Sequence, residues 1–328
     1  MTTFAVEMCK MNDKQTYQTV TKWSIIVTMV VMVVLSSCQG RSGGGQDDRD
    51  FETRRLEKIA RLDSTSIRER LDPDTVEGRE LLDKLTAEAW ILIDDISGCI
   101  ISEKNSDKRM YMASLTKMMT CLLALENGCG TDTIEITERD YVAKDSRVRL
   151  GDSYILHDLI YEMMLVSDND AAFAIANHIG GDTLNFCEVM NEKARYLGMN
   201  GTHYANPNGL PNDDNYSTAR DLLALARYCM TDSAFVQIVG TAEQDVPLLD
   251  GRHLPCHNTN VLLSTYEGCY GIKTGFTYQA GACLAAAATR DGITLYVVLL
   301  KSKNMALRFK EAAILLDYGF NVMQNIVK

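Results

Sequence analysis

The sequence lacks an excess of positive charge. Its 328 residues include 33 Lys and Arg against 44 Asp and Glu, so the formal net charge is −11. No basic stripe is present, and no basic run is interleaved with aromatic residues. Binding to the phosphates of a nucleic acid needs clustered Lys and Arg. We therefore expect no nucleic-acid partner.

The spacings that mark a metal site are also missing. Eight cysteines follow Cys38, yet none forms a Cys-x-x-Cys pair or a Cys/His spacing typical of zinc. Only His253-Leu-Pro-Cys-His257 places three candidate ligands close together, and such residues in a Pro-containing loop are more often surface polar groups. We expect no metal and no cofactor. The disulfide state of the eight cysteines and the oligomeric state are left open.

The apolar run near the N-terminus is too short to span a bilayer comfortably. It covers Ser24 to Ser37, 14 residues, and follows Lys14 and Lys22, which is typical of a signal-peptide core. The run leads into Leu35-Ser-Ser-Cys38, which resembles the lipobox of bacterial lipoproteins. This resemblance implies cleavage before Cys38 and attachment of lipid to its sulfur. The alternative is an uncleaved anchor with an accidental cysteine.

We therefore expect residues 1–37 to be a lipoprotein-type signal peptide, with Met11 as an alternative start of translation. The protein would be exported and held on a bacterial membrane by lipid on Cys38. Residues 38–85 are expected to be a tether and charged spacer, helical in part, because Gly40 to Asp50 is rich in glycine and charge.

Residues 86–328 predict one α+β domain. Apolar residues recur every three or four positions between about 114 and 230, which predicts a helical middle. Around it we expect two hairpins, Ala89–Asp94 with Cys99–Glu103 and Ala282–Thr289 with Ile293–Leu300, and a closing helix over Met305–Phe320. This order suggests one sheet assembled from both chain ends, with helices against it.

Ser114-Leu-Thr-Lys117 places a hydroxyl and an amine three residues apart in an otherwise apolar segment. Alone the pattern is weak, because about one Ser-x-x-Lys is expected by chance in a chain of this size, with the serine as a cap and the lysine in water. However, Ser167-Asp-Asn169 and Lys273-Thr-Gly275 follow once each in this order. The three motifs together are typical of class A β-lactamases and penicillin-binding proteins.

The first motif predicts an activated nucleophile. Positions i and i+3 of a helix share a face, so Lys117 can take the proton from Ser114 if burial and neighbouring positive charge keep its amine neutral. Ser114 at the helix N-terminus would also direct backbone N–H groups at a developing oxyanion. We expect the second oxyanion donor to be the backbone amide of Phe276.

The other two motifs predict proton transfer and substrate binding. Ser167 would lie on the path by which a proton reaches the leaving amine, and the Asn169 amide would hold the substrate backbone. Lys273 and Thr274 offer a cation and a hydroxyl to a substrate carboxylate. Gly275 would leave room for substrate beside the strand.

Residues 86–325 resemble the D-alanyl-D-alanine carboxypeptidases, the low-molecular-mass penicillin-binding proteins. The similar segments are Ala113-Ser-Leu-Thr-Lys-Met-Met-Thr120, Ser167-Asp-Asn-Asp-Ala-Ala172, Met190-Asn-Glu-Lys-Ala194, Leu197-Gly-Met199, Asn206-Pro-Asn-Gly-Leu210, Ser217-Thr-Ala-Arg-Asp221 and Lys273-Thr-Gly-Phe-Thr277. The resemblance implies a β-lactamase/transpeptidase-like α+β fold, with an antiparallel sheet of about five strands flanked by helices and a helical subdomain.

The same resemblance implies an activity and partners. The protein would be a serine-type carboxypeptidase that removes the terminal D-alanine of peptidoglycan stem pentapeptides through an acyl-serine intermediate. It would also bind β-lactams and act in the periplasm or cell-wall space. Arg308 is similar to a family arginine that helps bind the terminal carboxylate. Arg220 matches the family too, with a structural ion pair as the alternative.

Asp168 departs from the family pattern, which usually has Gly there, and class A β-lactamases share the Asp. A class A-like β-lactamase is therefore one alternative function. Those enzymes position the deacylating water with a Glu-x-x-Leu-Asn loop, and nothing between Ser167 and Lys273 matches; Glu188-Val-Met-Asn191 is one residue short. A non-catalytic penicillin-binding sensor is the other alternative. It would be favoured by decayed catalytic residues, and all are present.

The lipobox assignment predicts how the N-terminus is processed. A 14-residue helix is about 21 Å long, short of a hydrocarbon core of about 30 Å, so lipid on Cys38 would anchor the chain better than the apolar run. We expect the wild type to be shortened and to incorporate labelled palmitate, and Cys38→Ala to keep residues 1–37. Mass spectrometry checks this; unlabelled wild type at precursor length would make the apolar run the anchor.

Overall fold

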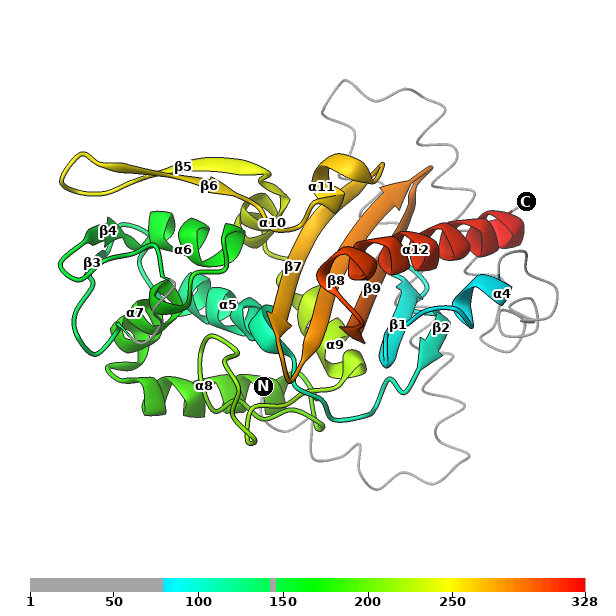
Figure 1. Ribbon diagram of the computed structural model, residues 1–328, viewed down its shortest axis with the longest axis horizontal. Helices are drawn as coiled ribbons and strands as arrows, with labels where there is room; N and C mark the ends of the chain where they lie inside the picture. Colours follow the sequence, from blue (N-terminus) through cyan, green and yellow to red (C-terminus); the bar gives the residue numbers. More distant parts are fainter. Residues whose placement is uncertain (1–78, 142–145, 328) are drawn as a thin grey trace, which may run out of the picture. The chain divides into compact units, whose positions relative to one another are not determined.

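The structure is a computed structural model that describes residues 79–141 and 146–327 (Figure 1). The expected signal peptide, Cys38 and most of the expected spacer lie outside these residues. No single helix within the described ranges is long and apolar enough to cross a membrane. Helices α9 (Ala219–Cys229) and α10 (Ser233–Gly240) reach that length and composition only as a pair, which is bent by 110°.

A five-stranded antiparallel sheet joins the two ends of the described chain, with strand order β2-β1-β9-β8-β7. Its strands are β1 (Ala89–Asp94), β2 (Ile100–Lys104), β7 (Cys269–Thr277), β8 (Gly281–Arg290) and β9 (Ile293–Ser302). Both predicted hairpins are present, and β1 pairs with β9 so that Ile91 lies opposite Val298. The expected α+β fold with a sheet from both chain ends is confirmed.

The sheet is buried on both faces, because side chains alternate between two hydrophobic cores. Ala89, Ile91 and Ile93 of β1 belong to one core. Trp90 and Leu92 belong to the other. All six residues of β1 are buried, and all of them except the last, Asp94, are apolar.

Helix α12 (Met305–Val327) covers one face of the sheet and is longer than the predicted Met305–Phe320 (Figure 1). It approaches closely at Gly319, where a Cβ would lie 2.8 Å from Leu295 Cδ1 and 3.0 Å from Leu92 Cδ2. The short helix α4 (Arg79–Leu82) precedes β1, and Leu82 and Leu85 are buried in this same core. Packing therefore includes residues before Thr86.

The helical subdomain packs on the other face. Besides α9 and α10 it contains α5 (Lys117–Asn127), α6 (Leu156–Leu165), α7 (Asn169–Gly180) and α8 (Thr183–Tyr196), preceded by the 3₁₀ turn η2 (Ala113–Thr116). Smaller elements are the hairpins β3 (Thr133–Glu135) with β4 (Ser153–Ile155) and β5 (Glu243–Pro247) with β6 (His253–His257), and helix α11 (Leu262–Thr265). Helix α5 runs through the middle of this region and begins beside β7 (Figure 1).

The close contact at Gly319 predicts a stability effect. Gly319→Val would force branched methyl groups against Leu295 and Leu92, and overpacking of this kind costs about 1–3 kcal/mol. We expect the urea midpoint of unfolding to fall accordingly. Asn321→Val, on an exposed position of the same helix, is the control and should change stability by less than about 0.5 kcal/mol. Equal midpoints for the two variants would contradict the packing argument.

Candidate active site

Ser114 lies in the 3₁₀ turn η2, and α5 begins only at Lys117. This corrects our expectation that the serine opens the α-helix itself. The turn is held tightly, because Thr116 Oγ1 donates to Ala113 O at 2.9 Å and both side chains are buried. Ala113 has φ +48°, a left-handed conformation that is uncommon for a residue with a Cβ. The nucleophile therefore sits on a constrained turn.

Lys117 is completely buried and has three hydrogen-bond partners. Its Nζ lies 3.1 Å from Ser114 Oγ, 2.9 Å from Asn169 Oδ1 and 2.8 Å from the carbonyl oxygen of Asn208. A neutral amine has two protons and one lone pair. Since the oxygens of Asn169 and Asn208 can only accept, they take the two protons, and the lone pair faces the hydroxyl of Ser114.

The protonation state of Lys117 agrees with this geometry. Burial lowers the pKa of its amine to about 7, although the negative charge of Asp168 acts to raise it. We had also expected a neighbouring positive charge to lower this pKa. Burial is the cause instead, and the repulsion between cations acts on Lys273. A substantial fraction of Lys117 is thus an uncharged base near neutral pH.

The carbonyl of Asn208 is a contribution that our sequence analysis missed. Gly209 has φ +88°, and a Cβ there would lie only 1.9 Å from Ala113 O, so the segment presses directly on the catalytic turn. The side chain of Asn206 accepts from Gly209 N at 2.7 Å and shapes the loop. The Asn-Gly turn sequence was visible, but a backbone carbonyl leaves no residue-type signal.

Ser167 and Asn169 are positioned by Asp168, the residue that departs from the family pattern. Its carboxylate caps α7 by accepting from the backbone N–H groups of Asp170 and Ala171. The same carboxylate also accepts from the backbone N–H of Arg147 at 2.7 Å. One side chain therefore ties the segment after residue 145 to the start of α7.

Ser167 itself has φ +67°, and its Oγ is buried without a hydrogen-bond partner among the described residues. An orphaned buried hydroxyl is costly unless a partner arrives. The expected partner, the leaving amine of a substrate, would satisfy it. The role of Ser167 in proton transfer stays a prediction.

Strand β7 brings the third motif beside the catalytic turn. A Cβ on Gly275 would lie 3.0 Å from Ser114 N and 3.1 Å from Ala113 Cβ. The glycine therefore makes room for the catalytic turn, whereas we had expected it to make room for substrate. Thr274 Oγ1 lies 2.7 Å from Thr259 Oγ1. Phe276 follows Gly275 in the same strand, with a half-exposed side chain.

Two buried basic side chains, Lys273 and Arg308, lie at this end of the site. Arg308 Nη1 donates to the Gly275 carbonyl at 2.9 Å, and Lys273 Nζ donates to Thr274 O at 3.2 Å. Burial lowers the pKa of Arg308 to about 10. Burial, and then the charges of Lys117 and Arg308, hold the pKa of Lys273 well below its usual range.

This clustering makes the site an acceptor for an anion. No ion pair joins Lys273 or Arg308 to a carboxylate within the described part of the chain. Uncompensated buried cations are unfavourable. A bound carboxylate would supply the missing negative charge and would raise the pKa of Lys273, restoring the cation that we expected there.

Arg220 and the His253–His257 segment have partners of their own and do not hydrogen bond to Ser114 or Lys117 within the described ranges. Arg220 pairs with Glu103 at 2.5 Å and with Asp107 at 2.7 Å, which confirms the structural ion pair that we had kept as the alternative. In the His253–His257 segment the two histidines are exposed and pair with different acids across the hairpin, whereas Cys256 is buried and donates to Glu162 at 2.6 Å.

The arrangement is suited to acyl transfer. A hydroxyl bonded to a neutral amine is an activated nucleophile, and the cationic end of the site is placed to hold a carboxylate. Asn169 contacts the amine and completes the group. No carboxylate hydrogen bonds to Ser114 or Lys117 in the ranges that the structure describes.

Known proteins resemble this chain in sequence and in fold. The family model described as D-alanyl-D-alanine carboxypeptidase matches residues 75–304. The D-alanyl-D-alanine carboxypeptidase DacF of Bacillus subtilis is 30% identical over 242 residues, which cover 72% of this chain and 62% of the relative. A D-alanyl-D-alanine carboxypeptidase of a Streptomyces species is 34% identical over 243 residues, covering 68% of this chain and 84% of the relative.

The solved structure of the Streptomyces K15 DD-transpeptidase has a TM-score of 0.69 and 32% identity to this chain, with 72% of this chain and 97% of that chain covered. The chain thus spans about three fifths of the Bacillus subtilis relative, 62% of its length, and nearly all of the Streptomyces K15 structure. Because the family match takes in more than half of the chain and all three motifs, this protein belongs to the D-alanyl-D-alanine carboxypeptidase family.

Proposed function

We propose that this protein is a serine-type D-alanyl-D-alanine carboxypeptidase that removes the terminal D-alanine from peptidoglycan stem pentapeptides and is acylated by β-lactams. One observation carries the proposal. The buried amine of Lys117 has two acceptors for its two protons and lies 3.1 Å from the Ser114 hydroxyl. The family membership supports the substrate class.

Acylation would begin with attack of Ser114 Oγ on the carbonyl of the penultimate D-alanine. The hydroxyl proton passes to Lys117 Nζ, and the oxyanion is held by backbone N–H groups, for which we propose Ser114 and Phe276. The C–N bond then breaks, and the leaving amine takes a proton relayed from Lys117 through Ser167. The terminal carboxylate of the leaving D-alanine would be bound by Lys273, Thr274 and Arg308.

Deacylation would be a second acyl transfer. A water molecule attacks the ester carbon and gives one proton to Lys117. Lys117 returns this proton to Ser114 Oγ as the Ser114–acyl bond breaks and releases the shortened peptide. A β-lactam leaves a bulky remnant on the ester instead of a departing amino acid. Since no described carboxylate bonds to Ser114 or Lys117, we propose that this acyl-enzyme is long-lived, unlike that of a class A β-lactamase.

We also propose that the protein acts outside the cytoplasm, in the periplasm or cell-wall space, anchored to a bacterial membrane by lipid on Cys38. The support is the sequence Leu35-Ser-Ser-Cys38 after a short apolar run. Residues 40–50, rich in glycine and charge, would then join the lipid to the catalytic domain as a tether, which would let that domain reach nearby cell wall.

Replacing the nucleophile tests the proposal. Ser114→Ala should lower D-alanine release from a stem pentapeptide by at least about 10³-fold and should abolish covalent labelling by fluorescent penicillin. Ser233→Ala, at the exposed start of α10, should keep both activities. Rapid penicillin hydrolysis by the wild type would indicate a β-lactamase. Labelling without any D-alanine release would indicate a sensor.

The pKa of Lys117 predicts a pH profile. Only the neutral amine accepts a proton, so penicillin acylation should level off above about pH 7 and fall about tenfold per pH unit well below it. The Asp168 charge raises this pKa, so Asp168→Asn should move the acidic limb to lower pH. Stopped-flow labelling between about pH 5 and 8 measures both. A constant wild-type rate, or a limb shifted to higher pH, would contradict this assignment of the base.

A further inference from the structure

Thr120 lies one turn beyond Lys117 on the same face of helix α5, and both side chains are completely buried. A threonine in a helix commonly donates its hydroxyl proton to a carbonyl three or four residues earlier. Thr116 does so in η2, toward Ala113 O at 2.9 Å. Thr120 instead donates to the carbonyl of Pro207 at 2.6 Å, 87 positions away. Its hydroxyl therefore joins two segments and does not serve the helix itself.

The loop that Thr120 reaches also supplies an acceptor to the candidate base. Pro207 directly precedes Asn208, whose carbonyl accepts a proton from Lys117 at 2.8 Å. Two successive carbonyls of one loop thus accept from two side chains on one face of α5. The bond to Pro207 is buried, so its loss would leave a carbonyl oxygen without a donor and away from water. It holds the Asn208 carbonyl close to Lys117.

The side chains nearest this carbonyl do not tie the loop to α5. Asn208 Oδ1 accepts from Leu210 N at 3.0 Å, and Asn208 Nδ2 is buried without a hydrogen-bond partner in the part of the chain that the structure describes. Asn206 also bonds inside the loop, because its Oδ1 accepts from Gly209 N at 2.7 Å. These bonds shape the turn without fixing its distance from Lys117.

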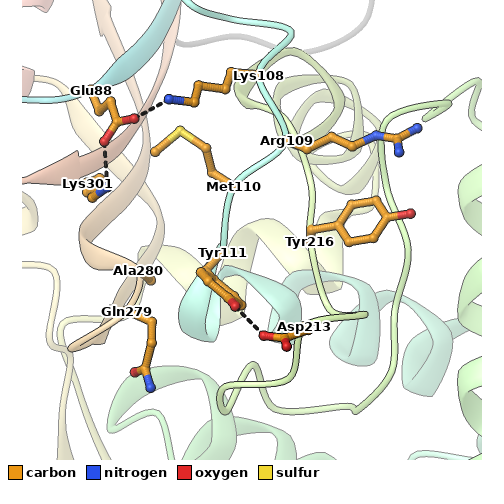
Figure 2. A pocket seen from close by; sticks show the side chains of 10 residues that line it. All are labelled: Glu88, Lys108, Arg109, Met110, Tyr111, Asp213, Tyr216, Gln279, Ala280 and Lys301. Atoms are coloured by element: carbon orange, nitrogen blue, oxygen red, sulfur yellow. Dashed lines mark hydrogen bonds and ion pairs between the residues drawn. The ribbon is translucent and has the colours of Figure 1, made fainter.

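Contacts farther along the loop hold other parts of it. Figure 2 shows Asp213 accepting the hydroxyl of Tyr111, at a distance of 2.5 Å. Asn215 Nδ2 donates to Thr116 Oγ1 over a long 3.4 Å. Both acceptor and donor lie several residues beyond the carbonyl that Lys117 uses, so neither bond sets the position of that carbonyl directly.

We propose that Thr120 is a positioning residue for the activation of Ser114, because it holds the Asn208 carbonyl where Lys117 needs an acceptor. The inference rests on the proposed function, in which Lys117 is the base. A neutral amine that loses one acceptor can turn the freed proton toward the Ser114 hydroxyl, which then accepts a hydrogen bond instead of donating one. The lone pair no longer faces the nucleophile, and proton transfer from Ser114 slows.

The same contact acts on the charge of Lys117. Acceptors stabilise an ammonium group more than a neutral amine, so the loss of one acceptor favours the neutral form. The charged groups that face this amine, Asp168 before α7 and Lys273 on β7, would be unchanged. Removing the Thr120 hydroxyl should therefore slow acylation and also lower the pH at which the base becomes neutral. A general loss of stability would not produce the second effect.

Thr120→Val tests this role, because valine keeps the volume of threonine and lacks the hydroxyl. Acylation of the full chain by fluorescent penicillin is followed by stopped flow between about pH 5 and 8. Its rate constant does not depend on how much of the protein is folded. We expect a plateau about 10- to 100-fold lower and an acidic limb shifted to lower pH by about half a unit. Thr120→Ala lacks the same hydroxyl and should show both effects, so the test does not depend on one variant.

Two further variants complete the experiment. Thr120→Ser keeps the hydroxyl and should return the plateau and the limb to those of the wild type. Thr231→Val is the matched control, since it removes a hydroxyl that donates to Tyr228 O at 2.7 Å between α9 and α10; it should change neither property.

The positioning role would be overturned by a wild-type plateau in Thr120→Val and Thr120→Ala, by a lower plateau without the limb shift, or by a serine variant as slow as the valine variant. Failure of the proposed function is distinct from these results, because penicillin would then not label Ser114 of the wild type.

Discussion

The burial of the Lys117 amine is the constraint on which the rest of the site depends. A charged amine that leaves water loses several kcal/mol of solvation, so burial favours the neutral form. A neutral amine still needs partners for its two protons, and Asn169 and Asn208 provide them from two separate segments. The remaining lone pair is then directed at Ser114. Helix α5, the loop before α9 and the start of α7 must therefore meet at one atom.

That meeting requires very close backbone approaches. Gly209 and Gly275 both approach the turn that carries Ser114. A Cβ would lie 1.9 Å from Ala113 O at the first position and 3.0 Å from Ser114 N at the second. Ala113 and Ser167 adopt left-handed conformations, each unfavourable by about 1–3 kcal/mol for residues with a side chain. Two hydrophobic cores on the faces of one sheet hold these conformations in place. Backbone strain is thus present in the first two motifs, although Asn105, Asp291 and Lys301 also have positive φ elsewhere in the described chain.

Charge is distributed unevenly over the molecule. The chain is acidic as a whole, yet Lys273 and Arg308 converge beside β7 without carboxylate partners among the described residues. Burial, and then the charges of Lys117 and Arg308, hold the pKa of Lys273 well below its usual range. Basic side chains are therefore concentrated beside β7 in a chain that is acidic overall.

The sequence by itself determined the three motifs, the two hairpins and the closing helix, because these features depend on residues close together in the chain. Tertiary structure alone decided which groups complete the site. The carbonyl of Asn208 lies 91 positions from Lys117, and a backbone atom has no residue identity to detect. The room made by Gly275 and the contact of Asp168 with Arg147 also join distant segments. Such contacts arise only when packing brings those segments together.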